Sequence, residues 1–309
     1  MKVLIAYDGS RCSEAALDDL VRAGLPESCE AVVISVAEVW LPPPDGEGNI
    51  AGITHDGESG RSIQKDKRNV AEAETLAYHA KKRLRQMFPG WQVRTQTAYG
   101  SPACAILDCS DQFMPSLIVT GSHGSSAISR FFLGSISHKV LTEAKCSVRV
   151  ARGRIEVDPV PVRIVVGFDG SKGALAAVDE VVSRQWREHS EIRLIAATEQ
   201  VRPSAIGRFI PPVAHIVEEV NESERRSIER LAAPPLARVQ TENIPATLHF
   251  YAGNPKDVIV EQADKWNADC IFVGANAFGS RLERFLLGST SAAVAARAHC
   301  SVEVVRRNM

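Results

Sequence analysis

The sequence predicts an α/β protein made of two copies of one doubly wound, Rossmann-like parallel sheet. Short apolar runs alternate with amphipathic stretches, which is the pattern of strands that are each followed by a covering helix. The pattern also occurs twice in the same order: KVLIAYDGS at 2–10 is answered by RIVVGFDGS at 163–171, and RFFLGS at 130–135 by RFLLGS at 284–289. With 309 residues, the chain has room for two domains of about 150 residues each.

Each expected element of the first copy follows from its residues. Some runs are apolar throughout, as in parallel strands covered on both faces, whereas 92–99 alternates with the period of two expected of an edge strand. The stretch from Ser10 to Glu14 brings hydroxyls and an early acid to a helix start, and Pro102 suits a first helical turn. The expected series is strand 3–7, helix from 10, strand 31–36, helix 67–88, strand 92–99, helix from 102, strand 117–121, helix 135–144 and strand 147–150.

The repeat also sets the expected domain boundaries. The first domain spans 1–151 and the second spans 163–309. Between them, residues 152–162 contain two prolines and no periodicity, which is typical of a short linker. Two stretches interrupt the alternation, 38–61 and 201–212, and we expect both to be loops near the carboxyl edge of the sheet.

Composition excludes several classes of protein. The formal net charge of -1 gives no broad field for nucleic acid or a membrane surface, so neither is expected as a partner. No window approaches the roughly 20 apolar residues of a membrane span. The apolar run at the start is too short for a leader, and the seven cysteines form no CxxC pair. We therefore expect a cytoplasmic protein with reduced thiols and neither a zinc site nor a disulfide framework.

The most informative motif joins the end of a predicted strand to the start of a helix. It has Gly121 and Gly124, then nine residues, then Gly134 and Ser135. Glycine allows the main chain to approach an anion closely, and free N–H groups at a helix start favour negative charge. Ligands of open α/β sheets bind at this edge, where Asp8 also lies and can accept hydrogen bonds from ribose hydroxyls.

On the residues alone, this motif is also compatible with ordinary turn chemistry. Neither GxxxxGK[ST] nor GxGxxG is complete, which disfavours P-loop hydrolysis and dinucleotide redox chemistry. His123 reads as an exposed, solvated loop residue rather than an acid or base. Ser10 and Ser171 read as helix caps rather than nucleophiles, because no base is placed beside them by a motif. No residue is assigned a catalytic role.

The pattern G-2x-G-9x-G-[S/T], preceded by a first strand that ends in DGS, resembles the ATP-binding signature of the universal stress protein family. The resemblance covers both halves of the chain. It implies a five-stranded parallel sheet in each domain and a pairing of the two domains about a pseudo-twofold axis. The final strands, at 147–150 and 301–304, would form the seam between them.

The resemblance also implies roles for individual residues. Asp8 would contact the ribose, and Mg²⁺ would accompany ATP through phosphate oxygens rather than a protein cage. Ala6 and Val36 would flank the adenine, with main-chain hydrogen bonds from Val36. The phosphates would be held by Gly121, Gly124, Gly134, Ser135 and the main chain of Ile136.

The second copy departs from the signature at the glycine loop. Aligned backward from RFLLGS, Ala275 and Phe278 replace the first two glycines of the first copy. Gly274 and Gly279 could substitute only through a shift of the loop. We therefore expect weak ATP binding or none in the second domain. The signature residues that remain in this copy are Asp169, Gly288 and Ser289.

Three functions stay open at this level. The first is an ATP-binding regulatory module with an unidentified protein partner. The second is a slow ATPase or phosphotransfer enzyme, which would need a placed base and a metal with carboxylate ligands. The third is an interaction scaffold without nucleotide. The sequence leaves open the stress, the pathway and any further pairing into a homodimer.

Overall fold

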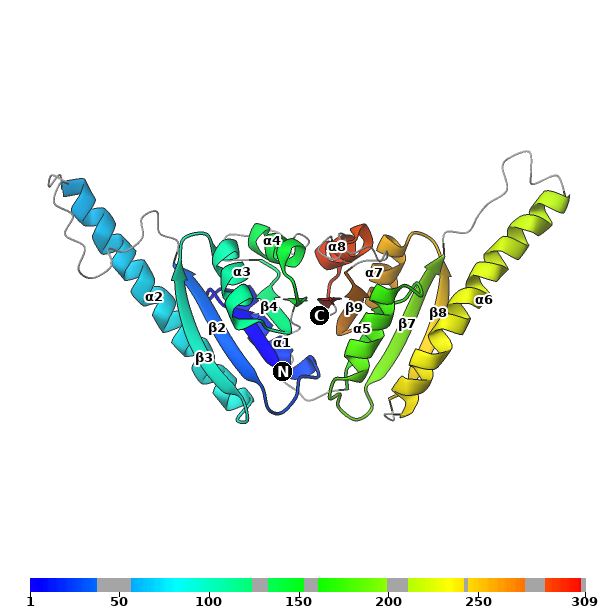
Figure 1. The fold of residues 1–309 in the computed structure, drawn as a ribbon, viewed down its shortest axis with the longest axis horizontal. Coiled ribbons are helices and arrows are strands. Elements are labelled where there is room, and N and C mark those ends of the chain that lie inside the picture. The colour runs from blue at the N-terminus through cyan, green and yellow to red at the C-terminus, as the bar shows by residue number, and fades with distance from the viewer. Residues whose placement is uncertain are drawn as a thin grey trace.

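The computed structural model describes residues 1–37, 57–123, 133–152, 161–198, 211–241, 244–275 and 287–306. We call 1–152 the first half and 161–306 the second half. Ten strands form one sheet in the order β3-β2-β1-β4-β5-β10-β9-β6-β7-β8. Figure 1 shows the two halves as mirror-like wings, with β5 and β10 at the centre and the long helices α2 and α6 on the outer flanks.

The strands divide evenly between the halves. Those of the first half are β1 (Lys2–Ala6), β2 (Glu30–Ala37), β3 (Gln92–Tyr99), β4 (Leu117–Gly121) and β5 (Ser147–Ala151). Those of the second half are β6 (Arg163–Gly167), β7 (Glu191–Thr198), β8 (Ala246–Ala252), β9 (Cys270–Gly274) and β10 (Ser301–Val305). Pairing is parallel within each half. The predicted fold class is confirmed, and β3 is an edge strand as its alternation indicated.

The helices follow the same plan in both halves. The first half has α1 (Arg11–Asp19), η1 (Leu20–Arg22), α2 (Gly57–Met87), α3 (Pro102–Phe113) and α4 (Ser135–Glu143). The second half has α5 (Lys172–Val182), α6 (Pro211–Thr241), α7 (Pro255–Lys265) and α8 (Ser289–Arg297). Among the described residues, none of these helices could cross a membrane.

One predicted boundary was wrong. The helix expected at 67–88 begins at Gly57, so the stretch expected as a loop at 38–61 is helical in its last five positions. The first turns of α2 are too polar to be recognised from the sequence, because the helical spacing of apolar residues becomes clear only further along the helix. The rest of that stretch, most of the expected loop at 201–212 and most of the expected linker lie outside the described residues.

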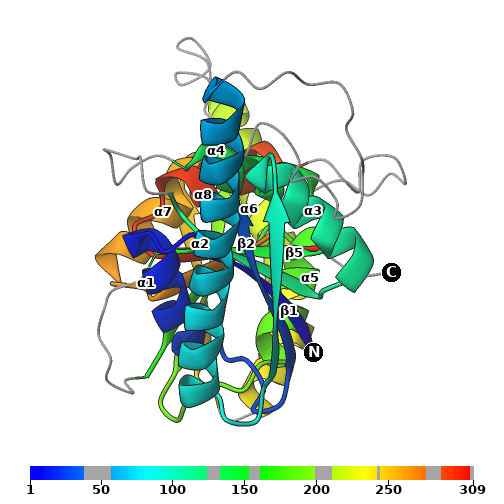
Figure 2. The same cartoon turned by 90° about the vertical axis from the view of Figure 1, so that its left-hand side faces the viewer.

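Helices cover both faces of the sheet, but the apolar cores differ between the faces. On one face, α3, α4, α7 and α8 pack over a core that is continuous from one half to the other. On the opposite face, α1 and α2 cover a core of the first half, and α5 and α6 cover a separate core of the second half. Figure 2, turned by 90°, shows α2 lying along its wing of the sheet.

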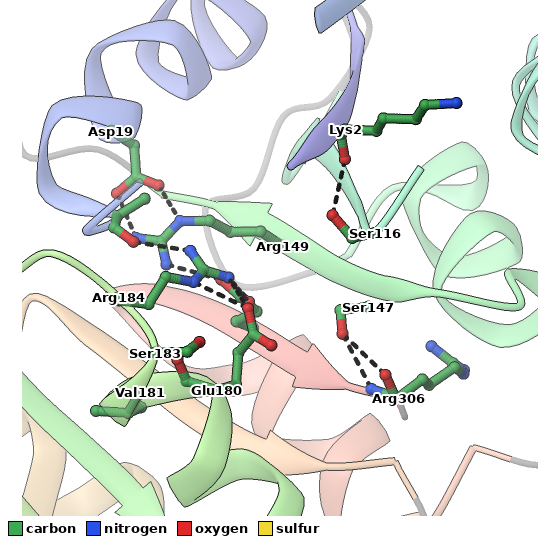
Figure 3. A network of polar contacts seen from close by, with 12 residues as sticks. Lys2, Asp19, Ser116, Ser147, Arg149, Glu180, Val181, Ser183, Arg184 and Arg306 are labelled. Atoms are coloured by element: carbon green, nitrogen blue, oxygen red, sulfur yellow. Dashed lines mark hydrogen bonds and ion pairs between the residues drawn. The ribbon is translucent and has the colours of Figure 1, made fainter. Parts of the chain in front are cut away.

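The seam between the halves is the one antiparallel pair among the described strands, β5 with β10. The predicted seam at the two final strands is therefore confirmed. The five-stranded sheets expected for the two domains join here into one ten-stranded sheet. On the face where the two cores are separate, charged side chains fill the space between α1 and α5 (Figure 3).

Two pseudo-equivalent arginines at the ends of the seam strands cross between the halves. The N–H of Arg306 donates to Ser147 Oγ (3.1 Å), and its Nη2 donates to a carbonyl in the last turn of α4 (2.6 Å). In the contact related to it by the pseudo-twofold axis, the N–H of Arg152 donates to Ser301 Oγ (2.9 Å), and its Nη2 donates to a carbonyl in α8 (3.3 Å). We call these two contacts the arginine clasps; Figure 3 shows the one formed by Ser147 and Arg306.

Candidate functional site

A hollow of about 400 Å³ opens at the carboxyl edge of the sheet in the second half. It lies where the strand order reverses between β6 and β9, which is the usual ligand position in open α/β sheets. The ends of β6, β7 and β9 and the starts of α5, α7 and α8 surround it. The lining residues are Gly167, Phe168, Asp169, Ser171, Ala174, Ile195, Ala197, Pro255, Ile259, Val273, Gly274, Leu287, Gly288, Ser289, Thr290 and Ser291.

The acidic side of the site is a turn that both halves share. Asp169 Oδ1 accepts the N–H of Ser171 (2.9 Å), and Ser171 caps α5. In the first half, Asp8 Oδ1 accepts the N–H of Ser10 (3.0 Å), and Ser10 caps α1. The predicted capping roles of both serines are confirmed. Both carboxylates are exposed, so each can also reach a ligand at this edge.

The opposite side is formed by the starts of α4 and α8. Their N-cap residues are Gly134 and Gly288, and neither provides a side-chain cap, in contrast to α1 and α5. The first N–H groups of a helix have no acceptor within the helix, so Ser135, Ile136 and their counterparts can donate to an anion. The sequence-predicted residues Asp169, Gly288 and Ser289 all line one hollow.

The apolar side of the site in the first half depends on unequal strand lengths. β1 ends at Ala6, whereas β2 continues to Ala37. The carbonyl of Ile34 accepts the N–H of Tyr7 (2.9 Å) and so faces β1. Main-chain groups alternate sides along a strand, so Val36 faces the same side beyond the end of β1. The adenine contact that the resemblance implies for Val36 stays a prediction.

The second half repeats this arrangement with smaller side chains. The carbonyl of Ile195 accepts the N–H of Phe168 (2.9 Å), and Ala197 lines the hollow two residues further on. Gly167 ends β6 at the position of Ala6. The side chains of Ile259 and Val273 occupy the space that a Cβ on Gly167 would need.

The structure corrects the alignment of the second glycine loop. Ser137 Oγ donates to the carbonyl of Gly121 (2.7 Å), and Ser291 Oγ donates to that of Gly274 (2.5 Å). Gly274, not Ala275, is therefore the counterpart of Gly121. Backward alignment from RFLLGS was wrong because the second loop is one residue longer, with the insertion between Ala275 and the start of α8.

The strand-end glycines also have a packing role that the sequence-based interpretation missed. A Cβ on Gly121 would lie 2.8 Å from the carbonyl carbon of Cys12 in the first turn of α1. A Cβ on Gly274 would overlap the main chain of Gly173 in the first turn of α5. Glycine is needed here for the close approach of helix and strand, whether or not a ligand binds.

His123 was expected to be exposed, and this prediction was wrong. The residue is 9% exposed, and its Nδ1 lies 3.0 Å from Ser122 Oγ. Burial, together with the charge of Arg152, lowers the pKa of the imidazole below its usual value. A buried imidazole with a lowered pKa is neutral at neutral pH, so His123 provides no positive charge for a phosphate.

Some predicted residues cannot be placed, and others were missed. Gly124 and Gly279 lie outside the described residues. Ser137 and Ser291, which tie each helix start to a strand end, were not singled out, although the repeat GS-x-S contains both. Within the described part of the chain, no group of three or more His, Cys, Asp or Glu residues could hold a metal ion.

Fold and edge site together define a duplicated, doubly wound α/β protein with a ligand hollow at the carboxyl edge of its sheet. The sequence profile of the universal stress protein family matches residues 1–152 and again 162–306. The chain therefore belongs to the universal stress protein family, with two family units in tandem.

Relatives that match the whole chain and relatives that match one half of it support this assignment. A universal stress protein of Mycobacterium tuberculosis is 27% identical over 312 residues, which cover 99% of this chain and 97% of that protein. One from Bacillus subtilis is 32% identical over 151 residues, or 49% of this chain and 98% of that protein. The crystal structure of a universal stress protein from Archaeoglobus fulgidus has a TM-score of 0.61 at 23% identity, covering 99% of this chain and 96% of that one.

Proposed function

We propose that this tandem protein is an ATP-binding regulatory module whose main nucleotide site lies in the first half. The observation that carries the proposal is that the exposed acid Asp8 and the uncapped helix start at Gly134 both lie at the carboxyl edge of the first half, in the construction that borders a hollow in the second half. The described parts of the first half repeat this construction, and the first half alone has the complete glycine signature.

The geometry suits an adenine nucleotide in one orientation. The apolar end, at Ala6 and Val36, would accept the adenine, with the free main chain of Val36 reading its edge. Asp8 would accept hydrogen bonds from ribose hydroxyls. The phosphates would lie against Gly134 and the first N–H groups of α4, where the helix dipole favours negative charge. Mg²⁺ would be held mainly by phosphate oxygens, since such sites need few protein ligands.

We expect the second half to bind ATP more weakly, despite its open hollow. Three residues after the strand-end glycine, the first half has Gly124 and the second half has Ala277. The added methyl group and the one-residue insertion both change the main chain that would meet the phosphates. The apolar end of the second half can still accept an adenine, so we expect the difference in ATP affinity to arise at the phosphates.

The nucleotide state would act on an unidentified protein partner in the cytoplasm, through the face that carries the two edge sites. This regulatory role is distinguished from hydrolysis by the nucleotide recovered from the purified protein. Denaturing the protein and separating the released nucleotides should yield intact ATP. ADP alone would favour a slow ATPase, and the absence of any nucleotide, together with no binding by calorimetry, would reject the site.

A matched pair of variants tests which half carries the site. Gly124→Phe places a bulky side chain in the glycine loop of the first half and should abolish ATP retention. Gly279→Phe makes the same change in the loop of the second half and should leave retention unchanged. Equal loss in both variants, or unchanged binding in Gly124→Phe, would contradict the assignment to the first half.

A further inference from the structure

The two seam strands are near copies that differ at their centre. The first reads CSVRV at 146–150 and the second CSVEV at 300–304. Their valines point to the continuous core, and because they are the same in both strands they would pack equally well in any pairing. The strands also end differently, in Ala151 and Val305, but the only charged difference is at the centre: Arg149 in β5 and Glu303 in β10.

The register places this central pair on the pseudo-twofold axis. Glu303 lies directly opposite Arg149, with Val302 opposite Val150 and Val304 opposite Val148. An antiparallel pair with this register is symmetric about its central pair. If β5 paired in the same way with a second copy of itself, Arg149 would face Arg149, and two copies of β10 would bring Glu303 against Glu303.

Both central residues are fully buried in a line of alternating charges (Figure 3). Asp19 Oδ2 accepts from Arg149 Nε (2.6 Å), and Arg149 Nη1 lies 3.3 Å from Glu303 Oε2. The other oxygen of Glu303 accepts from Arg184, which also pairs with Glu180 (2.7 Å). The order along the line is acid, base, acid, base, acid. Each buried charge therefore has an opposite charge beside it.

A second ion pair across the interface follows the same rule. Arg22 Nη1 contacts Asp269 Oδ1 at 2.7 Å, and both side chains are largely buried. By the repeat, Ser183 stands at the position of Arg22, and Ser116 at that of Asp269. Pairing of like halves would therefore replace this ion pair with a charge facing a serine.

We propose that the seam edge of each half is an interaction surface that accepts an unlike half and rejects a second copy of itself. The partner that fits β5 is a universal stress unit with an acid at the centre of its final strand. The partner that fits β10 has a base there. Like pairing would keep the pairs within each half, Asp19 with Arg149 and Arg184 with Glu303. It would, however, replace the pair between the two central residues with two equal charges facing each other, and such like-charge juxtaposition costs several kcal/mol in protein interfaces. The apolar face of the seam contributes affinity, and the charged face determines which partner binds.

The test begins with the folded full-length chain. A protease site is inserted within 153–160, and the folded protein is cut, so that the seam alone joins the two halves. The cut protein is mixed with a mass-labelled copy, left to exchange, and examined by native mass spectrometry. Unlike pairs should exceed like pairs by about 100-fold or more, given the cost of like-charge juxtaposition.

If the central charges determine which halves pair, neutralising each of them separately should give opposite results. Glu303→Gln removes the acid-to-acid conflict, so pairs of two second halves should appear, while pairs of two first halves remain absent. Arg149→Met should do the reverse. The control is Arg94→Met, which removes an exposed ion pair with Glu30 within the first half and should leave only unlike pairs.

Several outcomes would overturn the proposal. One is that the halves without substitutions form like and unlike pairs in statistical proportion. Another is that both neutral variants form only unlike pairs, and a third is that the cut protein dissociates into single halves. Circular dichroism before cutting verifies that each variant is folded. If Arg149→Met does not fold, the near-isosteric Glu303→Gln decides by itself, because it must produce like pairs of the second half only.

Discussion

The two halves of this protein share one architecture but differ in the places where each meets something else. At the edge site, the first half has the complete glycine signature, and the second half has a glycine loop that is one residue longer. At the seam, the same strand position carries a base in one half and an acid in the other. Duplication within one chain allows such differences, because each copy can specialise while the other retains the original role.

The counterpart acids Asp19 and Glu180 differ in their burial and in their partners. The side chain of Asp19 is 5% exposed and accepts from Arg149 and Ser301. The side chain of Glu180 is 29% exposed and pairs with Arg184. The acid of the first half is therefore part of the buried seam, whereas the acid of the second half lies at its margin.

The largest expected effect separates these two acids. Asp19→Asn leaves Arg149 buried with reduced compensation and should lower the free energy of unfolding by about 3–5 kcal/mol. Glu180→Gln weakens a partly exposed pair and should cost about 1 kcal/mol or less. Urea denaturation of both variants measures the difference. Similar costs for the two would mean that the line of charges is no more buried at one end than at the other.

The next effect concerns the strand-end glycines. Gly274→Ala forces a methyl group into the main chain of Gly173, and Gly121→Ala brings one 2.8 Å from Cys12. Overpacking of this kind costs about 1–3 kcal/mol, with the larger value expected for Gly274. Thermal unfolding of the ligand-free variants measures both costs. A stability equal to that of the wild type, with loss of ATP binding only, would instead assign these glycines to the ligand.

A smaller effect tests the unequal nucleotide sites. Asp8→Ala would remove the proposed ribose contact of the first half and should weaken ATP binding about tenfold, or 1.4 kcal/mol. Asp169→Ala makes the same change in the second half and should leave the tighter binding phase unaltered. Titration calorimetry resolves the two phases. A tenfold loss caused by Asp169→Ala would reverse the ranking of the halves.

The smallest effect is the pH dependence of stability that His123 contributes in the first half. Burial and Arg152 lower the pKa of His123 in the folded state. The unfolded chain then binds more protons, so stability rises with pH up to about 6.5, the usual pKa of histidine, and falls as the pH drops below it. His123→Gln should flatten this slope in urea titrations. A slope that survives unchanged would show that other groups cause it.

Much of this architecture could be predicted from the sequence, because the repeat, the apolar runs and the capping serines are local signals. What could not be predicted depends on contacts between distant segments. The approach of Gly121 to Cys12 arises only when the first helix packs on the end of β4, and the burial of His123 depends on the tertiary packing around it, with Arg152 nearby. The seam charges are hidden in the same way, since CSVRV and CSVEV look interchangeable until their register is known.

The arginine clasps have a consequence for how the protein is made. The last turn of α4 receives a hydrogen bond and a positive charge from Arg306, which is translated long after the first half has left the ribosome. The amino-terminal unit thus emerges without the group that finishes its final helix, and acquires it only when the closing strand arrives. The carboxyl end of α4 therefore receives this hydrogen bond only after the second unit has been synthesised.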